Sequence, residues 1–244
     1  MAGYAILSDI HGNLYALEAV IKDMADFDIE GVILLGDLID YGMQSNEVVQ
    51  YLHDRFRYKI LCNIWGNHER AIMLSDFQRF SSQRGVESAK NTAESLTEEA
   101  KRYLDREMCH EGCCEFLLDG LKCLAVHGSA EDVYWKPVLP DDVHGDYGNY
   151  DLVFSGHSHY PHIFTKFYDA DDIEMRNKHA VMFINPGSIG QPRNHNPYAQ
   201  YMIFDTAEKN AFVRCAAYDV EAAMRLFDGA SVDLFYRDRL LKGV

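Results

Sequence analysis

The sequence contains no apolar run approaching the roughly 20 residues that a membrane-spanning helix needs. Its first residues, MAGYAILSDIHGN, also lack the basic segment, apolar stretch and cleavage site of a secretory signal peptide. We therefore expect a protein that does not associate with membranes and that resides in the cytoplasm.

Basic residues are scarce, because 23 Lys and Arg face 38 Asp and Glu and give a formal net charge of −15. Nucleic acids are bound through clustered Lys and Arg, so this balance argues against non-specific binding of DNA or RNA. A small anionic substrate remains compatible with the charge, since a bound metal ion can dominate the local field of a site.

The six cysteines form no C-x-x-C pair, and no second ligand pair shows zinc-finger spacing. The run Cys109-His110-Glu111-Gly112-Cys113-Cys114 could form a zinc clip, but the missing partner pair disfavours it. In a reducing compartment we expect free thiols or small buried apolar side chains.

Repeats and low-complexity linkers are also absent, and 244 residues suit a single domain spanning 1–244. Apolar runs predict strands at 4–8, 32–35 and 59–64. Helical spacing predicts a helix from Leu14, capped by Asn13, and a second helix near 45–53. This alternation implies a parallel sheet with right-handed crossovers.

The middle of the chain is polar and helix-rich, which predicts a helical cap insertion over residues 70–112. Strong helix formers and an i,i+4 pair, Glu98 with Arg102, predict one helix over 92–107. Three basic residues of this cap are candidates for contact with a leaving group, although a solvated position is the alternative: Arg79, Arg84 and Lys90.

The second half of the chain is mostly strand. Asp119-Gly120 between two apolar runs indicates a β-hairpin. Further strands are expected at 152–154, 181–184, 200–204 and 211–216, followed by a closing helix at 220–227. The predicted fold class is α/β: a layered α/β-β/α sandwich of two mixed sheets flanked by helices.

Acidic, amide and histidine side chains recur just after the predicted strands. The five clusters are Asp9-Ile10-His11, Gly36-Asp37-Leu38-Ile39-Asp40-Tyr41-Gly42, Gly66-Asn67-His68-Glu69, His127-Gly128 and Gly156-His157-Ser158-His159. Open α/β sheets bind ligands beyond the carboxyl ends of their strands, so these clusters should converge. Their ligand types suit borderline metals, and two such ions ~3.5–4 Å apart can clamp a phosphoryl group.

This ordered set, D-x-H, G-D-x-x-D-x-G, G-N-H-E, H-G and G-H-S-H, resembles the calcineurin-like metallophosphoesterase family from Ser8 to about Asp205. The segment NPGSIGQPR at 185–193 is similar to the family's small bacterial and archaeal branch of phosphodiesterases and diadenosine-tetraphosphatase-like phosphatases. The resemblance implies two divalent or transition metal ions, with manganese expected and iron, zinc or nickel compatible with the same ligands.

The resemblance also implies the role of each residue. One ion would be held by Asp9, His11 and His159. The other would be held by Asn67, His127 and His157. Asp37 would bridge the two ions, His68 would act as general acid on the leaving group, and Asp40 would orient His68. Attack on phosphorus would come from a metal-activated hydroxide.

The substrate-facing residues are less sharply defined. Arg193 could clamp a phosphate, with a surface salt bridge as the alternative. Tyr134 and Trp135 could stack on a nucleobase or line the pocket, with core packing or a lid as the alternative. Six histidines outside the pattern are expected to be structural or exposed: His53, His110, His144, His162, His179 and His195.

The sequence therefore predicts a dinuclear-metal-dependent phosphoesterase acting on small phosphomonoesters or phosphodiesters. A dinucleoside polyphosphate hydrolase is the main alternative, followed by a protein phosphatase and by a non-catalytic metal-bound scaffold or nucleotide sensor. The pair His68 and Asp40 distinguishes an enzyme from a scaffold, because a scaffold has no need of a general acid. The oligomeric state is left open.

Overall fold

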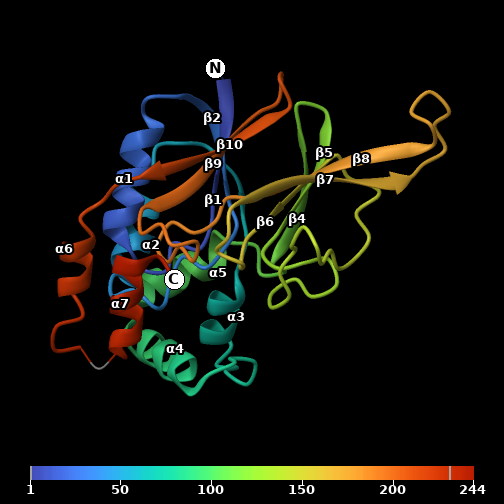
Figure 1. Cartoon of the computed structure of the whole chain (residues 1–244). Helices are drawn as coiled ribbons and strands as arrows, with labels where there is room; N and C mark the ends of the chain where they lie inside the picture. The colour runs from blue at the N-terminus through green and yellow to red at the C-terminus, as the bar shows by residue number, and fades with distance from the viewer. Residues whose placement is uncertain (1, 231) are drawn as a thin grey trace.

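Two five-stranded mixed sheets pack face to face in the computed structural model, which describes residues 2–230 and 232–244 (Figure 1). The first sheet has the order β10-β9-β1-β2-β3 and contains β1 (Ala2–Leu7), β2 (Asp28–Leu34), β3 (Ile60–Asn63), β9 (Ala199–Asp205) and β10 (Asn210–Ala216). The second has the order β4-β5-β6-β8-β7 and contains β4 (Cys113–Leu118), β5 (Leu121–Val126), β6 (Leu152–Ser155), β7 (His162–Asp169) and β8 (Lys178–Asn185).

Each sheet combines parallel and antiparallel pairs. In the first sheet β1, β2 and β3 pair in parallel, β9 pairs antiparallel with β1, and β10 pairs antiparallel with β9. In the second sheet β5, β6 and β8 run parallel, and β4 and β7 are antiparallel edges. The predicted α/β fold with two mixed sheets is confirmed, and so is the β4–β5 hairpin across Asp119-Gly120.

Strand β1 is buried on both faces, which explains its unbroken apolar run. Tyr4 and Ile6 pack between the two sheets, while Ala5 and Leu7 face the helices that cover the first sheet. Successive side chains of a strand point to opposite faces, so one short strand contributes to two cores.

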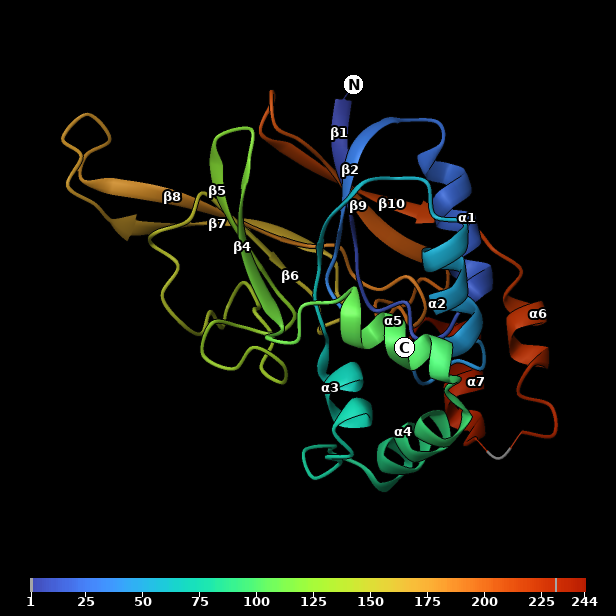
Figure 2. The same cartoon turned by 180° about the vertical axis from the view of Figure 1, so that it is seen from behind.

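Helices α1 (Leu14–Met24) and α2 (Ser45–Asp54) cover the outer face of the first sheet (Figures 1 and 2). The predicted N-cap is confirmed, because the Ala16 N–H donates to Asn13 Oδ1 at 3.1 Å. Over the outer face of the second sheet lies the connection between β5 and β6, which packs Val138 and Tyr147 against Phe183.

The prediction of one helix over 92–107 is wrong, because the chain forms two. Helix α4 (Gln83–Ser95) ends at Leu96, whose backbone is extended, and α5 (Glu98–Arg106) begins after Thr97. The Thr97 side chain accepts the Ala100 N–H at 3.1 Å, which makes it an N-cap. Glu98 and Glu99 add favourable charge to the first turn of the new helix.

Three helices gather at the end of the molecule opposite the N-terminus: α3 (Asn67–Met73), α4 and α7 (Leu234–Lys242) (Figures 1 and 2). The predicted closing helix is shorter than expected, as α6 spans Val220–Arg225, and neither α7 nor β7 was predicted. The cap boundaries at 70–112 stay a prediction. Among the described residues, no helix combines the length and apolar character that crossing a bilayer requires.

Candidate metal centre

The five sequence clusters meet at one edge of the two sheets, as predicted. Each cluster directly follows a strand, and the strands concerned are β1, β2, β3, β5 and β6. Side chains of Asp9, His11, Asp37, Asn67, His127 and His159 are buried there, and His157 lines the adjoining cavity. Groups of donor atoms within 4.8 Å of one another form at this edge, and His157 belongs to one of them.

One half of the centre is built from the ends of β1 and β6. Asp9 Oδ1 lies 3.1 Å from His159 Nε2, and His11 Nε2 lies 3.2 Å from the same nitrogen. His11 Nε2 is also 3.7 Å from Asp37 Oδ2, so this half extends to the end of β2.

The other half is built around Asn67, the first residue of α3. Asn67 Oδ1 lies 3.0 Å from His127 Nε2 and 2.9 Å from His157 Nδ1. His127 Nε2 is 3.3 Å from Asp37 Oδ2. The same Asp37 oxygen therefore lies close to a nitrogen of each half, which is the position of a bridging ligand.

Each imidazole ring has one nitrogen that faces the other donors and one that faces away from them. The hydrogen bond of the nitrogen that faces away fixes the orientation of the ring. Three rings use Nδ1 toward a main-chain carbonyl: His11 toward Ile39 (3.2 Å), His127 toward Leu35 (2.7 Å) and His159 toward Gln191 (2.6 Å). His157 is reversed, because its Nε2 lies 3.1 Å from the Trp135 carbonyl and its Nδ1 points inward. A carbonyl only accepts, so each outer nitrogen carries the hydrogen and each inner nitrogen of a neutral ring presents a lone pair.

This arrangement brings lone pairs together without a hydrogen between them. The inward nitrogens of His11 and His159 are 3.2 Å apart, and Asp9 Oδ1 is buried with no hydrogen-bond partner. The other Asp9 oxygen is satisfied, because it accepts from Ser8 and from the His157 N–H. Cations between these atoms would remove the repulsion, so the donor set fits divalent metal ions.

The pKa values show how burial and charge act on the centre before any cation is present. Burial, reinforced by the charge of Arg193, lowers the pKa of His159 to about 3, and burial lowers that of His157 to about 4. Burial alone would raise the pKa of Asp37, but nearby His127 and His68 hold it well below its usual range. Neutral imidazole and ionised carboxylate are the ligand forms that metals need, and the shifts of His157, His159 and Asp37 favour these forms. His127 differs, because despite burial the charge of Asp37 raises its pKa to about 9, so a metal ion would displace a proton there.

His68 stands beside the donors with its own carboxylate partner. Its Nδ1 lies 2.7 Å from Asp40 Oδ2, and its Nε2 is 4.0 Å from Asp37 Oδ2. Burial alone would lower the pKa of His68, but the charge of Asp37 and the hydrogen bond with Asp40 raise it. The Asp40 oxygen that His68 does not use accepts the hydroxyls of Ser88 (2.6 Å) and Thr92 (2.9 Å) from α4. Sequence reasoning missed these two residues, whose only signal is their i,i+4 spacing on one helix face.

Glu69 is a third residue whose role the sequence did not reveal. It is fully buried, and its carboxylate accepts main-chain N–H groups of Asp37 (2.8 Å), Leu38 (2.7 Å) and Gly66 (2.8 Å), with Ile39 more distant at 3.3 Å. Burial and the nearby Asp37 charge raise the pKa of Glu69 to about 7, while the N–H donors favour the ionised form. Glu69 thus ties the loop after β2 to the start of α3.

We expect Glu69→Gln to destabilise the protein by about 2–4 kcal/mol, because an amide NH₂ would face main-chain donors and leave them unsatisfied. The shift of the urea unfolding midpoint measures this loss. Glu94→Gln, on the exposed face of α4, is the matched control and should unfold like the wild type. Equal midpoints for both variants would show that the Glu69 charge is not needed there.

The backbone at the donors adopts a conformation that non-glycine residues rarely take. The φ angles are +54° at Asp9, +47° at His11, +52° at Asp37, +63° at His157 and +60° at His159. Asp and His are among the residues that tolerate this left-handed region best. A left-handed residue turns the chain sharply, so each donor leaves its strand and points across the edge of the sheet.

Two glycines allow close backbone approach between the loops after β2 and β3. At Gly36, with φ +88°, an added Cβ would overlap the Gly66 backbone, and at Gly66 it would overlap the Asp37 carboxylate. Any larger residue would push the β2 and β3 loops apart.

A cavity of about 880 Å³ opens onto the centre. Its walls include His68, Trp135, His157, His159 and Arg193. Two of the three substrate residues expected from sequence thus face it. The third does not line the cavity, because the Tyr134 hydroxyl donates to the carbonyl of His110 instead.

None of the six histidines set aside from the pattern belongs to a donor group within the described part of the chain: His53, His110, His144, His162, His179 and His195. The donor groups of residues 2–230 and 232–244 also include no cysteine, so the structure does not gather the side chains of 109–114 into a donor group. Instead, the His110 ring stacks on Trp65 at 4.0 Å between centroids.

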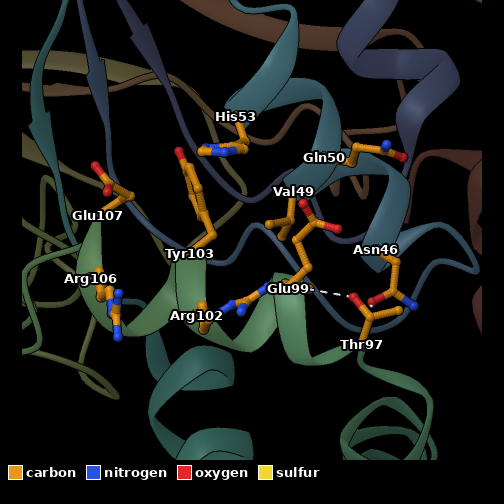
Figure 3. A pocket seen from close by; sticks show the side chains of 11 residues that line it. Asn46, Val49, Gln50, His53, Thr97, Glu99, Arg102, Tyr103, Arg106 and Glu107 are labelled. Carbon is orange, nitrogen blue, oxygen red and sulfur yellow. Dashed lines mark hydrogen bonds between the residues drawn. The ribbon is translucent and has the colours of Figure 1, made fainter.

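A second cavity, of about 390 Å³, lies between α2 and α5 and is separate from the centre (Figure 3). Figure 3 shows His53 and Tyr103 side by side at one end, with Asn46 and Thr97 at the other. It shares no wall residue with the cavity at the metal centre, and His53 is its one histidine. Its composition gives no comparable metal-binding set.

The two sheets and the buried histidine–carboxylate cluster define a metal-binding α/β sandwich protein. Residues 3–209 match the family model of the calcineurin-like phosphoesterase superfamily domain. The chain therefore belongs to the calcineurin-like phosphoesterase superfamily, and the predicted resemblance is confirmed.

Relatives and solved structures extend the similarity over the full chain. The uncharacterised protein MJ0912 of Methanocaldococcus jannaschii is 29% identical over 231 residues, covering 90% of this chain and 89% of that protein. A metallophosphoesterase from Sphaerobacter thermophilus is 26% identical, with a TM-score of 0.72 and coverage of 99% and 100% of the two chains. The hypothetical protein PH1004 of Pyrococcus horikoshii shares the fold at 20% identity, with a TM-score of 0.77 and coverage of 100% and 99%.

Proposed function

We propose that this protein is a dinuclear-metal-dependent phosphoesterase that hydrolyses small phosphomonoesters or phosphodiesters. The observation that carries the proposal is the hydrogen-bonded pair of His68 and Asp40 beside two donor sets that share Asp37. A metal-binding scaffold would need the donors but not the pair. We further propose a cytoplasmic location and no binding of nucleic acid.

The donor sets assign the ligands of two ions. One ion would be held by Asp9, His11 and His159, the other by Asn67, His127 and His157, with Asp37 shared. When bound, two divalent ions polarise the phosphoryl oxygens and lower the pKa of a water molecule that attacks phosphorus. Manganese is the expected ion, and iron, zinc and nickel suit the same nitrogen and oxygen ligands.

His68 supplies the proton for the leaving group. With Nδ1–H donating to Asp40, the raised pKa of His68 favours a proton on Nε2, and the residue lines the cavity. As the water oxygen bonds to phosphorus, the bond to the ester oxygen breaks and that oxygen leaves with the electron pair. The Nε2 proton neutralises the leaving oxygen, and a proton from the attacking water restores the imidazolium.

We expect manganese-dependent hydrolysis of bis-p-nitrophenyl phosphate that stops on addition of a chelator and returns with excess Mn²⁺. Release of p-nitrophenol, followed by absorbance, measures the rate. The variant His53→Ala alters an exposed histidine of α2 outside the centre and should retain the wild-type rate. A chain with bound metal that hydrolyses no phosphomonoester, phosphodiester or dinucleoside polyphosphate would instead be a scaffold.

A further inference from the structure

Four arginines line the cavity at the metal centre; Arg79 is paired with Asp132, and the other three come from separate elements. Arg84 lies on α4, Arg193 in the loop before β9, and Arg239 on α7. We call these three the arginine cluster. Across residues 2–230 and 232–244, no Asp or Glu side chain forms a salt bridge with any of them, although acidic residues outnumber basic ones by 38 to 23 in the chain. The part of the wall that these three arginines form is therefore positive, while the Asp37 carboxylate lines the same cavity at the metal centre.

One aromatic ring contacts two of the guanidinium groups. The guanidinium carbon of Arg84 lies 4.1 Å from the centroid of the Phe235 ring on α7. The guanidinium carbon of Arg239 lies 5.1 Å from the same centroid. The next residue, Tyr236, stacks on Tyr41 at 4.5 Å between centroids, which fixes α7 against the loop after β2. Cation–π contacts orient an arginine without neutralising its charge.

The cluster also contains a buried N–H donor that has no hydrogen-bond acceptor. Arg193 Nε is buried and has no hydrogen-bond partner, while Arg239 Nε donates to the main-chain oxygen of Val244. Burial, together with the charge of Arg193, lowers the pKa of Arg239 to about 10. Like charges held close together and partly out of water are costly unless an anion joins them.

The position of the cluster relative to the donors indicates which anion fits. The cluster and the residues His68, His157 and His159 line the same cavity, whose volume of about 880 Å³ far exceeds the needs of one phosphate. The metal ions would take the phosphate that reacts. A phosphodiester has a single negative charge and would leave the arginines without a partner, whereas consecutive phosphates carry closely spaced charge.

We propose that Arg84, Arg193 and Arg239 form a subsite for the non-reacting phosphates of a linear polyphosphate, free or attached to a nucleoside. The cleavage step rests on the proposed function, but the binding does not. In that step, water oxygen bonds to the phosphorus at the donors and the P–O–P bond on the cluster side breaks. The bridging oxygen leaves with the electron pair on the shortened chain, and the water protons pass to the two phosphate products.

Calorimetry on protein depleted of metal tests the subsite directly, with inorganic tripolyphosphate as ligand and orthophosphate as reference. We expect Arg239→Gln to weaken tripolyphosphate binding by about tenfold or more, since each lost charge-assisted hydrogen bond contributes roughly 1.5–3 kcal/mol. The matched control is Arg237→Gln, on the same helix but paired with Asp238, and it should bind like the wild type.

Arg193→Gln gives an independent test in case Arg239→Gln does not fold, and circular dichroism monitors folding of both. Tripolyphosphate affinities equal to the wild type in a folded variant would overturn the subsite.

With Mn²⁺ restored, both variants should lose at least about tenfold more kcat/KM on a nucleoside polyphosphate than on bis-p-nitrophenyl phosphate. Intact tripolyphosphate binding with no hydrolysis of any substrate would sustain the subsite and remove the proposed hydrolase function.

Discussion

Asp37→Asn is expected to lose both metal ions and to reduce phosphoester hydrolysis by roughly 10³-fold or more, since removing a single electrostatic stabiliser already costs about 10²–10³-fold. The Asp37 Oδ2 atom lies 3.3 Å from His127 Nε2 and 3.7 Å from His11 Nε2, so both donor sets depend on its charge. Its other oxygen accepts the His68 N–H at 2.9 Å, so the substitution also disturbs the start of α3.

Metal content by mass spectrometry and the rise of Tm with added Mn²⁺ measure this effect without an activity assay. The wild type should show a clear increase in Tm, because ions that bind only the folded state stabilise it. Asp141→Asn, at an exposed loop carboxylate, should respond like the wild type. A full complement of two ions in Asp37→Asn would exclude a bridging role for this carboxylate.

His68→Ala is expected to retain both ions and yet lose about 10²–10⁴-fold in kcat, the usual contribution of a positioned general acid. Its side chain also lies within 4.8 Å of donor atoms of His11 and Asp37, but neither of the two proposed donor sets includes it, and its Nδ1 is bound to Asp40. The loss should be larger for an alkyl phosphoester than for a p-nitrophenyl ester, because a poor leaving group depends more on protonation.

Steady-state rates on the two leaving groups, with metal content measured on the same samples, separate this role from metal binding. His53→Ala again serves as the histidine control. Turnover at the wild-type level with metal bound would remove His68 from the mechanism, whereas loss of metal would make it a structural support of the centre.

The sequence allowed the donors to be predicted because each one follows a strand. Strand ends of a parallel sheet share one edge, so the positions of Asp9, Asp37 and Asn67 after strands of the first sheet already imply that they meet. The family resemblance then supplied the pairing of donors within each set. The side of each imidazole ring that faces inward could not be predicted, because it depends on carbonyls such as Gln191, 32 residues from His159.

Residues that act through contacts distant in sequence escaped prediction. Ser88 and Thr92 reach Asp40 across 48 and 52 residues, and their hydroxyls have no distinctive pattern of their own. Helix α7 lies beyond the motif-bearing segment, and only the folded chain brings Arg239 to the cavity. Thr97 is a residue type that often caps helices, so the end of one helix and the start of another could have been predicted there. The strong helix formers around it favoured a continuous helix instead.

At the five donors with a left-handed backbone, the residue that metal binding requires is not the residue that would give the most stable fold. Glycine would adopt those angles without strain, whereas a residue forced into a sparsely populated region costs of order 1–3 kcal/mol. Replacing Asp9 or His159 by glycine would thus relieve the backbone while removing the ligand. Substitution of these donors by glycine would therefore favour a more stable protein that lacks the metal ligands. Each donor in this geometry therefore carries a cost in backbone strain that only its role as a ligand explains.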